Sequence, residues 1–437
     1  MFERITLLFL LGILVAISYF SETLAYGNRI WFCIGGGLGV FFFYLFAVSA
    51  HYRKRQTPHA PGYRPFVSIV IPAKNEETVI RATVSEMMKI VYHSSEGEPN
   101  YELIVVDDGS TDRTLQVLQD IAKEYPNLVV YHRAPRPRSS KPAVLNEVDP
   151  ICKGSIMAVF DADARVKPDF MERIIPFLAD PRVGGVQAHK MISNRDVNWL
   201  SEAQYVELIM MGRFEEGRDL SNGACEMRGN GMIVKREAVA DTGGWTEIAL
   251  TEDLDMSTKM MLNGWEVRFC PDIPVYEEAV LNWGALYKQR RRWAEGSIRR
   301  YLQYMFRLLG PTVPLNKKAD MLAFLCEFFI PIWMLVDLAF HVRRLVQGVP
   351  LEVSAFMYFA TLMFSITAFN VAKGIHERVS RDWKEIIRLT IMNELFAVFW
   401  VPVILRTYLF MLVSSRPMAW IKTEHTGTHH DTEIAHS

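Results

Sequence analysis

The chain has 437 residues, of which 50% are hydrophobic and 22% are charged, and its formal net charge is −1. This near-neutral balance gives no sign of a nucleic-acid partner. The apolar residues gather at both ends while the middle has the composition of a water-soluble domain, so we expect a membrane protein. The five cysteines lack paired spacing and predict a reducing compartment without a disulfide framework: Cys33, Cys152, Cys225, Cys270 and Cys326.

Residues 1–55 are predicted to form two transmembrane helices, within the uncharged stretches 5–21 and 30–50. About 20 apolar residues are enough to cross a hydrocarbon core of about 30 Å. The first stretch also fits a signal peptide, but it is long and a second span follows directly, which favours a retained anchor. The basic run His51–Arg55 then places the middle of the chain on the cytoplasmic side by the positive-inside rule.

Residues 60–285 are predicted to form a soluble α/β domain. Short runs rich in β-branched residues alternate with stretches of helical length, such as 78–91 and 114–124. Continuous apolar strands separated by helices are typical of a mostly parallel sheet that is covered on both faces. The strands are expected at 66–71, 103–106, 128–131, 156–160 and 183–187.

Two carboxylates, Asp161 and Asp163, follow directly after the apolar run 156–160. Side chains two residues apart at a strand end face the same way and can share a hard cation such as Mg²⁺ or Mn²⁺. Taken alone, this pattern fits a simple turn better. The loops Pro72–Glu77 and Asp107–Asp112 follow two other expected strands, and ligands bind beyond the carboxyl ends of such strands. Three polar clusters at one edge therefore favour a common ligand site.

Two further motifs follow, Thr251–Asp253 and Gln289–Trp293. The first fits either a catalytic carboxylate or a capping threonine with two acids in the first helical turn. The second is rich in arginine, which suits either a helix at the membrane surface or contacts to a diphosphate, and both can hold together. Residues 286–316 are expected to form an amphipathic interfacial region.

Residues 317–415 are predicted to contain about three transmembrane or re-entrant helices, and 416–437 a polar tail. The apolar segments are 321–342, 355–372 and 386–413. Basic residues between the last two segments predict a cytoplasmic loop, but Arg343 and Arg344 would then lie on the opposite side of the membrane. A re-entrant or interfacial first segment would remove this conflict. Pro331 and Pro402 predict kinks.

The motifs resemble, in their order, the inverting family 2 glycosyltransferases with a GT-A fold, which include cellulose, hyaluronan and poly-N-acetylglucosamine synthases. The resemblance covers roughly residues 66–301 and implies a Rossmann-like, mostly parallel catalytic domain flanked by transmembrane helices. The stretches Lys141–Asn146, Met227–Gly231 and Gly243–Trp245 are most similar to the cyanobacterial subfamily that glucosylates diacylglycerol. One departure is Ser140, where many relatives have glycine before the lysine.

This resemblance implies transfer of glucose from UDP-glucose to the hydroxyl of 1,2-diacylglycerol, giving β-monoglucosyldiacylglycerol at the cytoplasmic face of the bilayer. Asp161 and Asp163 would hold the metal ion. Asp253 is expected to be the catalytic base, with Glu252 as the alternative. The residues expected to contact the nucleotide sugar are Pro72, Glu76, Asp107, Asp108, Lys141, Asp161, Gln289, Arg290, Arg292 and Trp293.

Two other functions stay open from the sequence. A processive polysaccharide synthase of the poly-N-acetylglucosamine, hyaluronan or cellulose type would use the same Gln289–Trp293 element, and its spans would form a channel. A catalytically silent membrane scaffold is disfavoured, because every expected acidic residue is present. A UDP-sugar, a membrane-borne acceptor and the bilayer are the expected partners, with no nucleic acid.

Overall fold

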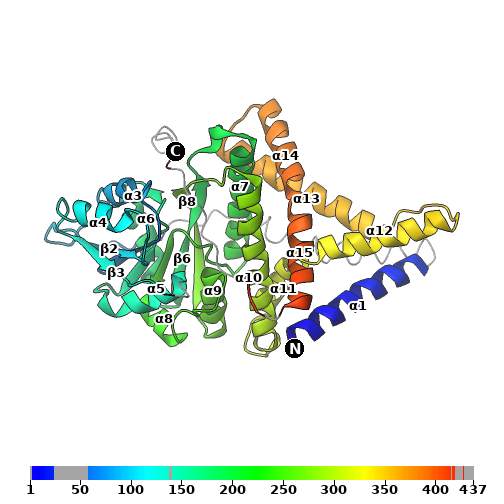
Figure 1. The fold of residues 1–437 in the computed structure, drawn as a ribbon, viewed down its shortest axis with the longest axis horizontal. Helices are drawn as coiled ribbons and strands as arrows, with labels where there is room; N and C mark the ends of the chain where they lie inside the picture. The colour runs from blue at the N-terminus through cyan, green and yellow to red at the C-terminus, as the bar shows by residue number, and fades with distance from the viewer. Residues whose placement is uncertain (1, 24–57, 137–139, 415, 419–426, 428–437) are drawn as a thin grey trace. The chain divides into compact units, whose positions relative to one another are not determined.

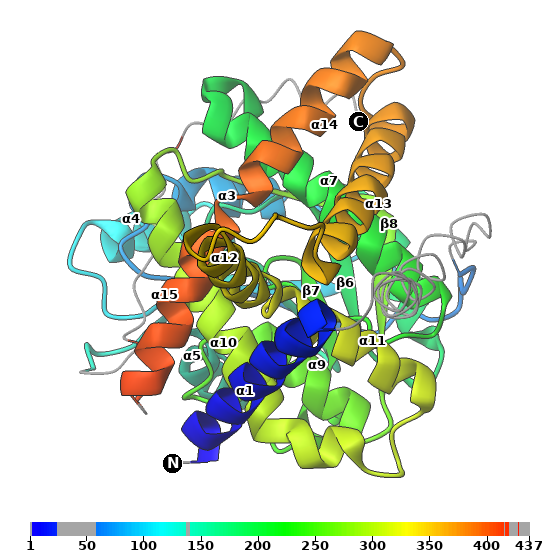
Figure 2. The same cartoon turned by 90° about the vertical axis from the view of Figure 1, so that its right-hand side faces the viewer.

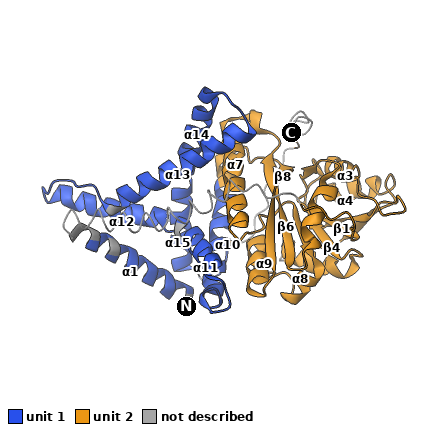
Figure 3. Cartoon of the chain, turned by 180° about the vertical axis from the view of Figure 1, so that it is seen from behind, with its two compact units in different colours: residues 1–53, 287–419 blue, residues 54–286, 420–437 orange. Residues whose placement is uncertain are grey.

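The computed structural model describes residues 2–23, 58–136, 140–414, 416–418 and 427. The predicted second span at 30–50 and the basic run His51–Arg55 lie outside these residues. The chain divides into two compact units, which Figure 3 shows in different colours. We call them the helical unit (Met1–Arg53 with Tyr287–Ala419) and the sheet unit (Lys54–Leu286 with Trp420–Ser437).

The sheet unit is built on an eight-stranded sheet in the order β3-β2-β1-β4-β7-β6-β8-β5. Its strands are β1 (Val67–Ala73), β2 (Tyr101–Asp107), β3 (Leu128–His132), β4 (Ile156–Val159), β5 (Arg165–Val166), β6 (Val183–Ile192), β7 (Met232–Lys235) and β8 (Glu266–Glu277). Four neighbouring pairs are parallel: β1 with β2, β1 with β4, β2 with β3, and β6 with β8. The prediction of a mostly parallel sheet is confirmed.

Helices cover both faces of this sheet (Figure 1). On one face lie α3 (Ile80–Met87), α4 (Thr114–Ile121) and α6 (Phe170–Ile174), and on the other lie α5 (Lys141–Val148), α8 (Arg236–Asp241) and α9 (Glu252–Leu262). Successive residues of a strand point to opposite faces, so Ile69 packs in the core under α3 while Val70 packs in the core under α5. Because both faces are covered, every residue of β2 is buried.

Strands β5, β7 and β8 were not among the expected strands, and the residues of β7 and β8 explain why those two were missed. β8 contains Pro271 and Pro274, and proline within an apolar run argues against a strand. The register on β6 jumps there: Ala188 pairs with Cys270, but His189 pairs with Pro274. Residues 271–273 bulge out of the ladder, so Pro271 takes no part in the strand pairing, and the pairing resumes at Pro274. β7 is only four residues long and runs antiparallel to both of its neighbours.

The helical unit contains α1 (Phe2–Thr23), most of α10 (Trp283–Leu309), α11 (Leu315–Glu327), α12 (Ile330–Val346), α13 (Ala355–Arg378), α14 (Trp383–Ala397) and α15 (Trp400–Val413). α13 and α14 lie side by side (Figure 2). The segment expected at 321–342 is broken into α11 and α12, which meet at a bend of 53°, and Pro331 lies at the start of α12. Proline is tolerated there because the first turn of a helix needs no N–H donor.

Three helical segments in the described part of the chain are long and apolar enough to cross a membrane: Glu3–Phe20, Phe356–Arg378 and Trp383–Val413. The bent pair α11 and α12 would make a fourth if it acts as one span. Leu7 of α1, Ile298 of α10 and Tyr408 of α15 share one apolar core within this unit.

Candidate active site

The loops after β1 and β2 are held together by hydrogen bonds at the carboxyl edge of the sheet. Asn75 donates its N–H to the hydroxyl of Ser110 (2.9 Å) and accepts from the N–H of Thr111 through its side chain (2.7 Å). Glu76 is buried, and its N–H donates to Thr114 Oγ1 (2.7 Å). The structure thus brings together the first two polar clusters that the sequence singled out.

Asp107 is the last residue of β2 and Asp108 follows it; both carboxylates are buried, and each has a basic partner at or just after the end of β3. Asp107 Oδ2 lies 2.7 Å from Nδ1 of His132, and Asp108 pairs with Arg133. Burial raises the pKa of Asp108, although Arg133 and Lys74 oppose this rise. His132 and Arg133 were not among the predicted site residues, yet they directly follow the expected strand 128–131 and so lie at the same edge of the sheet.

Asp161 and Asp163 lie beyond β4, beside the first turn of α5. Lys141, the first residue of α5, places its Nζ 2.5 Å from Asp161 Oδ1 and 3.6 Å from Glu252 Oε1. Burial opposes the charge of Lys141, but Asp161 and Glu252 outweigh it and raise its pKa. Asp163 is buried, and its Oδ2 accepts the N–H of Glu278 (2.8 Å). Ser140 caps α5 by accepting the N–H of Ala143, so the absence of glycine there is accommodated.

The donor chemistry of Asp161 and Asp163 fits a divalent cation. The side chain of Asp161 is 38% exposed, so it is open to an incoming ion, while Asp163 is fixed by the backbone. Among the described residues, no group of three or more His, Cys, Asp or Glu is arranged to hold a metal. Mg²⁺ usually takes one or two carboxylates and completes its shell with water and substrate phosphates. Two carboxylates therefore suffice for an ion that arrives with a diphosphate.

Glu252 and Asp253 open α9 near this cluster. Burial and the neighbouring charge of Glu252 raise the pKa of Asp253 to about 6, against the pull of Lys141 and Lys190. A carboxylate with such a pKa is a better proton acceptor near neutral pH than an ordinary aspartate. Thr251 precedes the helix but makes no side-chain capping hydrogen bond, while Glu252 and Asp253 lie in the first turn of the helix.

An ion pair that the sequence did not predict completes the polar cluster. Lys190 Nζ of β6 lies 2.9 Å from Glu277 Oε1, at the end of β8. Burial raises the pKa of Glu277, Lys190 opposes this, and Asp163 and Asp161 add to the rise. The expected strand at 183–187 stopped before Lys190, whereas β6 continues to Ile192.

The predicted donor contacts from Gln289 to Trp293 lie on α10, in the helical unit. Arg290 is buried, and its guanidinium carbon lies 4.1 Å from the centroid of the Trp293 ring and 5.4 Å from that of Trp400. Aromatic stacking of this kind holds a guanidinium group in place. The roles of Gln289, Arg290, Arg292 and Trp293 toward the donor stay predictions.

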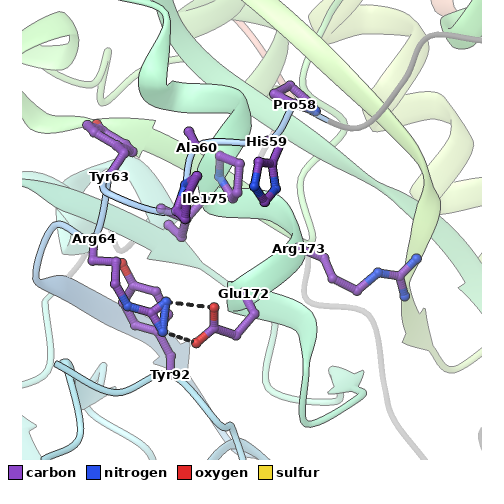
Figure 4. A pocket seen from close by; sticks show the side chains of 11 residues that line it. Pro58, His59, Ala60, Tyr63, Arg64, Tyr92, Glu172, Arg173 and Ile175 are labelled. Carbon is purple, nitrogen blue, oxygen red and sulfur yellow. Dashed lines mark hydrogen bonds and ion pairs between the residues drawn. The ribbon is translucent and has the colours of Figure 1, made fainter. Parts of the chain in front are cut away.

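A pocket of about 340 Å³ lies elsewhere on the sheet unit, and none of the predicted site residues lines it (Figure 4). Arg64 binds both carboxylate oxygens of Glu172 at its rim and lies 5.4 Å from the centroid of the Tyr92 ring. These contacts tie the segment before β1 to α6. We therefore assign these pocket residues a structural role and not a part in the proposed active site.

Comparisons with known proteins identify the family. The chain matches the family model described as glycosyltransferase like family 2 over residues 64–296. It is 33% identical over 392 residues to a β-monoglucosyldiacylglycerol synthase from Nostoc sp., covering 88% of this chain and 81% of the relative. The synthase of the same name from Synechocystis sp. is 32% identical over 373 residues, covering 84% of this chain and 76% of the relative.

Among solved structures, a mannosyltransferase from Pyrobaculum calidifontis in complex with GDP-Man and Mn²⁺ matches with a TM-score of 0.61. It is 20% identical, and the match covers 91% of this chain and 99% of that one. The likeness confirms the predicted GT-A fold. The family match and the relatives together show that the chain is an enzyme and belongs to glycosyltransferase family 2.

Proposed function

We propose that this chain is an inverting membrane glycosyltransferase that transfers glucose from UDP-glucose to 1,2-diacylglycerol, giving β-monoglucosyldiacylglycerol. The observation that carries the proposal is the cluster of Lys141, Asp161, Asp163 and Asp253 at the carboxyl edge of the sheet. The substrate assignment is supported by 33% identity to a synthase of that product along 88% of the chain.

Residues at the ends of β1 and β2 would bind the nucleoside. Pro72 pairs with Val106 in register, so Glu76, Asp107 and Asp108 lie beside it at the same edge. Asp161 and Asp163 would hold Mg²⁺ or Mn²⁺, which would neutralise charge developing on the departing diphosphate. Lys141, already paired with Asp161, would add a fixed positive charge near the same phosphates.

Asp253 would remove the proton from the acceptor hydroxyl. As that oxygen forms its bond to C1 of glucose, the bond between C1 and the phosphate oxygen breaks, and UDP leaves with the electron pair. The proton goes to Asp253, whose pKa of about 6 leaves it ionised near neutral pH. A single displacement on an α-linked donor inverts C1, so the product is β-linked.

The acceptor would reach this site from the bilayer. Three helical segments with the length and apolar character of membrane spans support a multi-pass protein, and the basic run at 51–55 supports a cytoplasmic catalytic domain. Gln289, Arg290, Arg292 and Trp293 would then close the site near the membrane surface, with arginine toward the diphosphate and tryptophan beneath the acceptor.

A direct assay tests this function. Purified full-length protein in lipid nanodiscs is incubated with radiolabelled UDP-glucose, diacylglycerol and Mg²⁺ or Mn²⁺, and the lipid and water phases are separated. We expect one labelled glycolipid, with a β linkage by the proton coupling at C1. A long water-soluble polymer would instead identify a processive synthase, and no turnover with UDP-glucose, UDP-galactose or UDP-N-acetylglucosamine would identify a scaffold.

A further inference from the structure

Asn230 is completely buried and lies between two glycines that adopt left-handed backbone conformations. Gly229 has a φ of 88° and Gly231 a φ of 73°. A Cβ atom at Gly231 would lie 2.7 Å from Cγ1 of Val275, which is closer than carbon atoms approach. Residues with side chains rarely adopt such φ angles, so the two glycines allow the backbone to turn sharply on both sides of Asn230.

The backbone around Asn230 is fixed against the end of β4. Gly231 donates its N–H to the carbonyl of Val159, the last residue of that strand (3.1 Å). The carbonyl of Asn230 accepts from the buried side chain of Gln187 (2.8 Å), whose own oxygen accepts the N–H of Arg228 (2.7 Å). These hydrogen bonds hold Asn230 beside the end of β4, next to Asp161.

The side chain of Asn230 joins two parts of the polar cluster. Its Oδ1 accepts the N–H of Asp161 (3.1 Å), and its Nδ2 donates to Glu277 Oε2 (3.3 Å). A backbone N–H can only donate and a carboxylate can only accept, so this amide orientation alone satisfies both partners. A neutral side chain with one donor and one acceptor is what this position requires.

We propose that Asn230 is a positioning residue for the metal-binding end of the site, acting through Asp161 and through Glu277 with its partner Lys190. It fixes the backbone that carries Asp161, and it holds the Glu277 side chain through a second hydrogen bond. This role rests on the proposed function, because it assumes that Asp161 receives a metal ion. Groups that orient metal ligands through hydrogen bonds typically change metal affinity by about 10- to 100-fold when removed.

The donor and acceptor roles in the hydrogen bond between residues 230 and 277 can be exchanged by substitution, which gives a sharp test. In Asn230→Asp the new carboxylate still accepts from Asp161 but faces Glu277 with a like charge. In the double variant Asn230→Asp/Glu277→Gln, the amide of Gln at 277 donates to the new aspartate and restores the pair in reverse. Asn230→Ser keeps a polar side chain, but its hydroxyl oxygen lies one bond nearer the backbone than Oδ1 and Nδ2, so it should lose both hydrogen bonds.

We would titrate the full-length protein with Mn²⁺ in the presence of UDP. The electron paramagnetic resonance signal of free Mn²⁺ then gives the amount of Mn²⁺ that is bound. We expect Asn230→Ala and Asn230→Asp to weaken Mn²⁺ binding by about 10- to 100-fold. The double variant should return to within about threefold of Glu277→Gln alone, and Asn230→Ser should weaken binding about as much as Asn230→Ala. This readout needs no acceptor, so it is independent of which glycolipid or polymer the enzyme makes.

Asn100→Ala is the matched control. Asn100 donates to the carbonyls of Arg64 (3.0 Å) and Pro65 (3.2 Å), before β2 and at the opposite edge of the sheet. Its loss should lower the melting temperature without changing Mn²⁺ affinity. The proposal is overturned if Asn230→Ala or Asn230→Ser binds Mn²⁺ like the wild type, or if the double variant binds no better than Asn230→Asp.

Discussion

Lys141 and Asp161 form an ion pair with 2.5 Å between Nζ and Oδ1, although one residue begins α5 and the other follows β4. Lys141 also lies 3.6 Å from Glu252, so a single ammonium group faces carboxylates from two different motifs. The side chain of Lys141 is only 15% exposed, which strengthens these interactions relative to those in water. Lys141 therefore links the predicted metal site electrostatically to the predicted base.

The first prediction concerns the charge of Lys141. Lys141 lowers the pKa of Asp253, so Lys141→Met should raise that pKa above its present value of about 6. Because Asp253 must be ionised to accept a proton, the acid limb of kcat/KM should move toward higher pH, by about one unit. Lys141→Arg keeps the charge and should leave the limb near its original position. If the acid limb of kcat/KM in Lys141→Met stays at the wild-type pH, Lys141 does not influence the pKa of the base.

The second prediction concerns Asp253 itself. Asp253→Asn should reduce transfer by about 10²- to 10⁴-fold, because a general base typically contributes this much. UDP binding, measured by calorimetry, should stay close to wild type, since the proposed nucleoside contacts lie at the ends of β1 and β2. In the wild type, activity should fall as pH drops through about 6, where Asp253 becomes protonated. Full transfer by Asp253→Asn would exclude it as the base.

The third prediction separates Glu252 from Asp253. The charge of Glu252 raises the pKa of Asp253, so Glu252→Gln should lower it and move the acid limb toward lower pH while transfer continues. If Glu252 were instead the base, the same variant would lose transfer at every pH. The pH profiles of Glu252→Gln and Asp253→Asn, recorded side by side, decide between the two residues.

The edge of the sheet that carries Asp107 and Asp161 was predictable because each acid directly follows a buried apolar strand of a parallel pair. Parallel strands place their carboxyl ends together, so chain position alone implied spatial proximity. The same reasoning did not reach the ion pair between Lys190 and Glu277. The two residues come from β6 and β8, which adjoin the antiparallel strands β7 and β5, and β8 contains prolines, which sequence patterns exclude from strands.

The contacts of Asn230 were not predictable from the sequence for a different reason. It lies in an irregular loop with no periodicity, and its place depends on the left-handed angles of Gly229 and Gly231. Both glycines belong to the stretch Met227–Gly231, but the presence of glycine does not show which strand the residue beside it contacts. Local backbone conformation decides that, and only the folded chain shows it.

The fourth prediction concerns the two carboxylates expected to hold the metal. Asp163→Asn keeps an oxygen that can accept the N–H of Glu278 but removes the negative charge. It should therefore retain the wild-type melting temperature while weakening metal-dependent UDP binding by about tenfold or more, because hard cations prefer charged oxygen donors. Asp161→Asn should weaken it too and also free Lys141 from its closest partner. Calorimetry with and without Mn²⁺ checks both, and metal-independent UDP binding in the wild type would contradict the metal role.

The last prediction concerns stability at Gly231. In Gly231→Ala the new Cβ meets Val275 Cγ1 at 2.7 Å, in addition to the cost of a positive φ. Gly243 has a similar φ of 83° but nothing within 4 Å of its Cβ position, so Gly243→Ala isolates the backbone cost. We expect Gly231→Ala to be less stable than Gly243→Ala by about 1–3 kcal/mol, the usual cost of overpacking a core. Thermal unfolding in detergent measures both variants. Adding Val275→Ala removes the clashing methyl groups and should recover much of the additional loss of stability in Gly231→Ala. Equal melting temperatures of Gly231→Ala and Gly243→Ala would show that the contact with Val275 does not lower the stability.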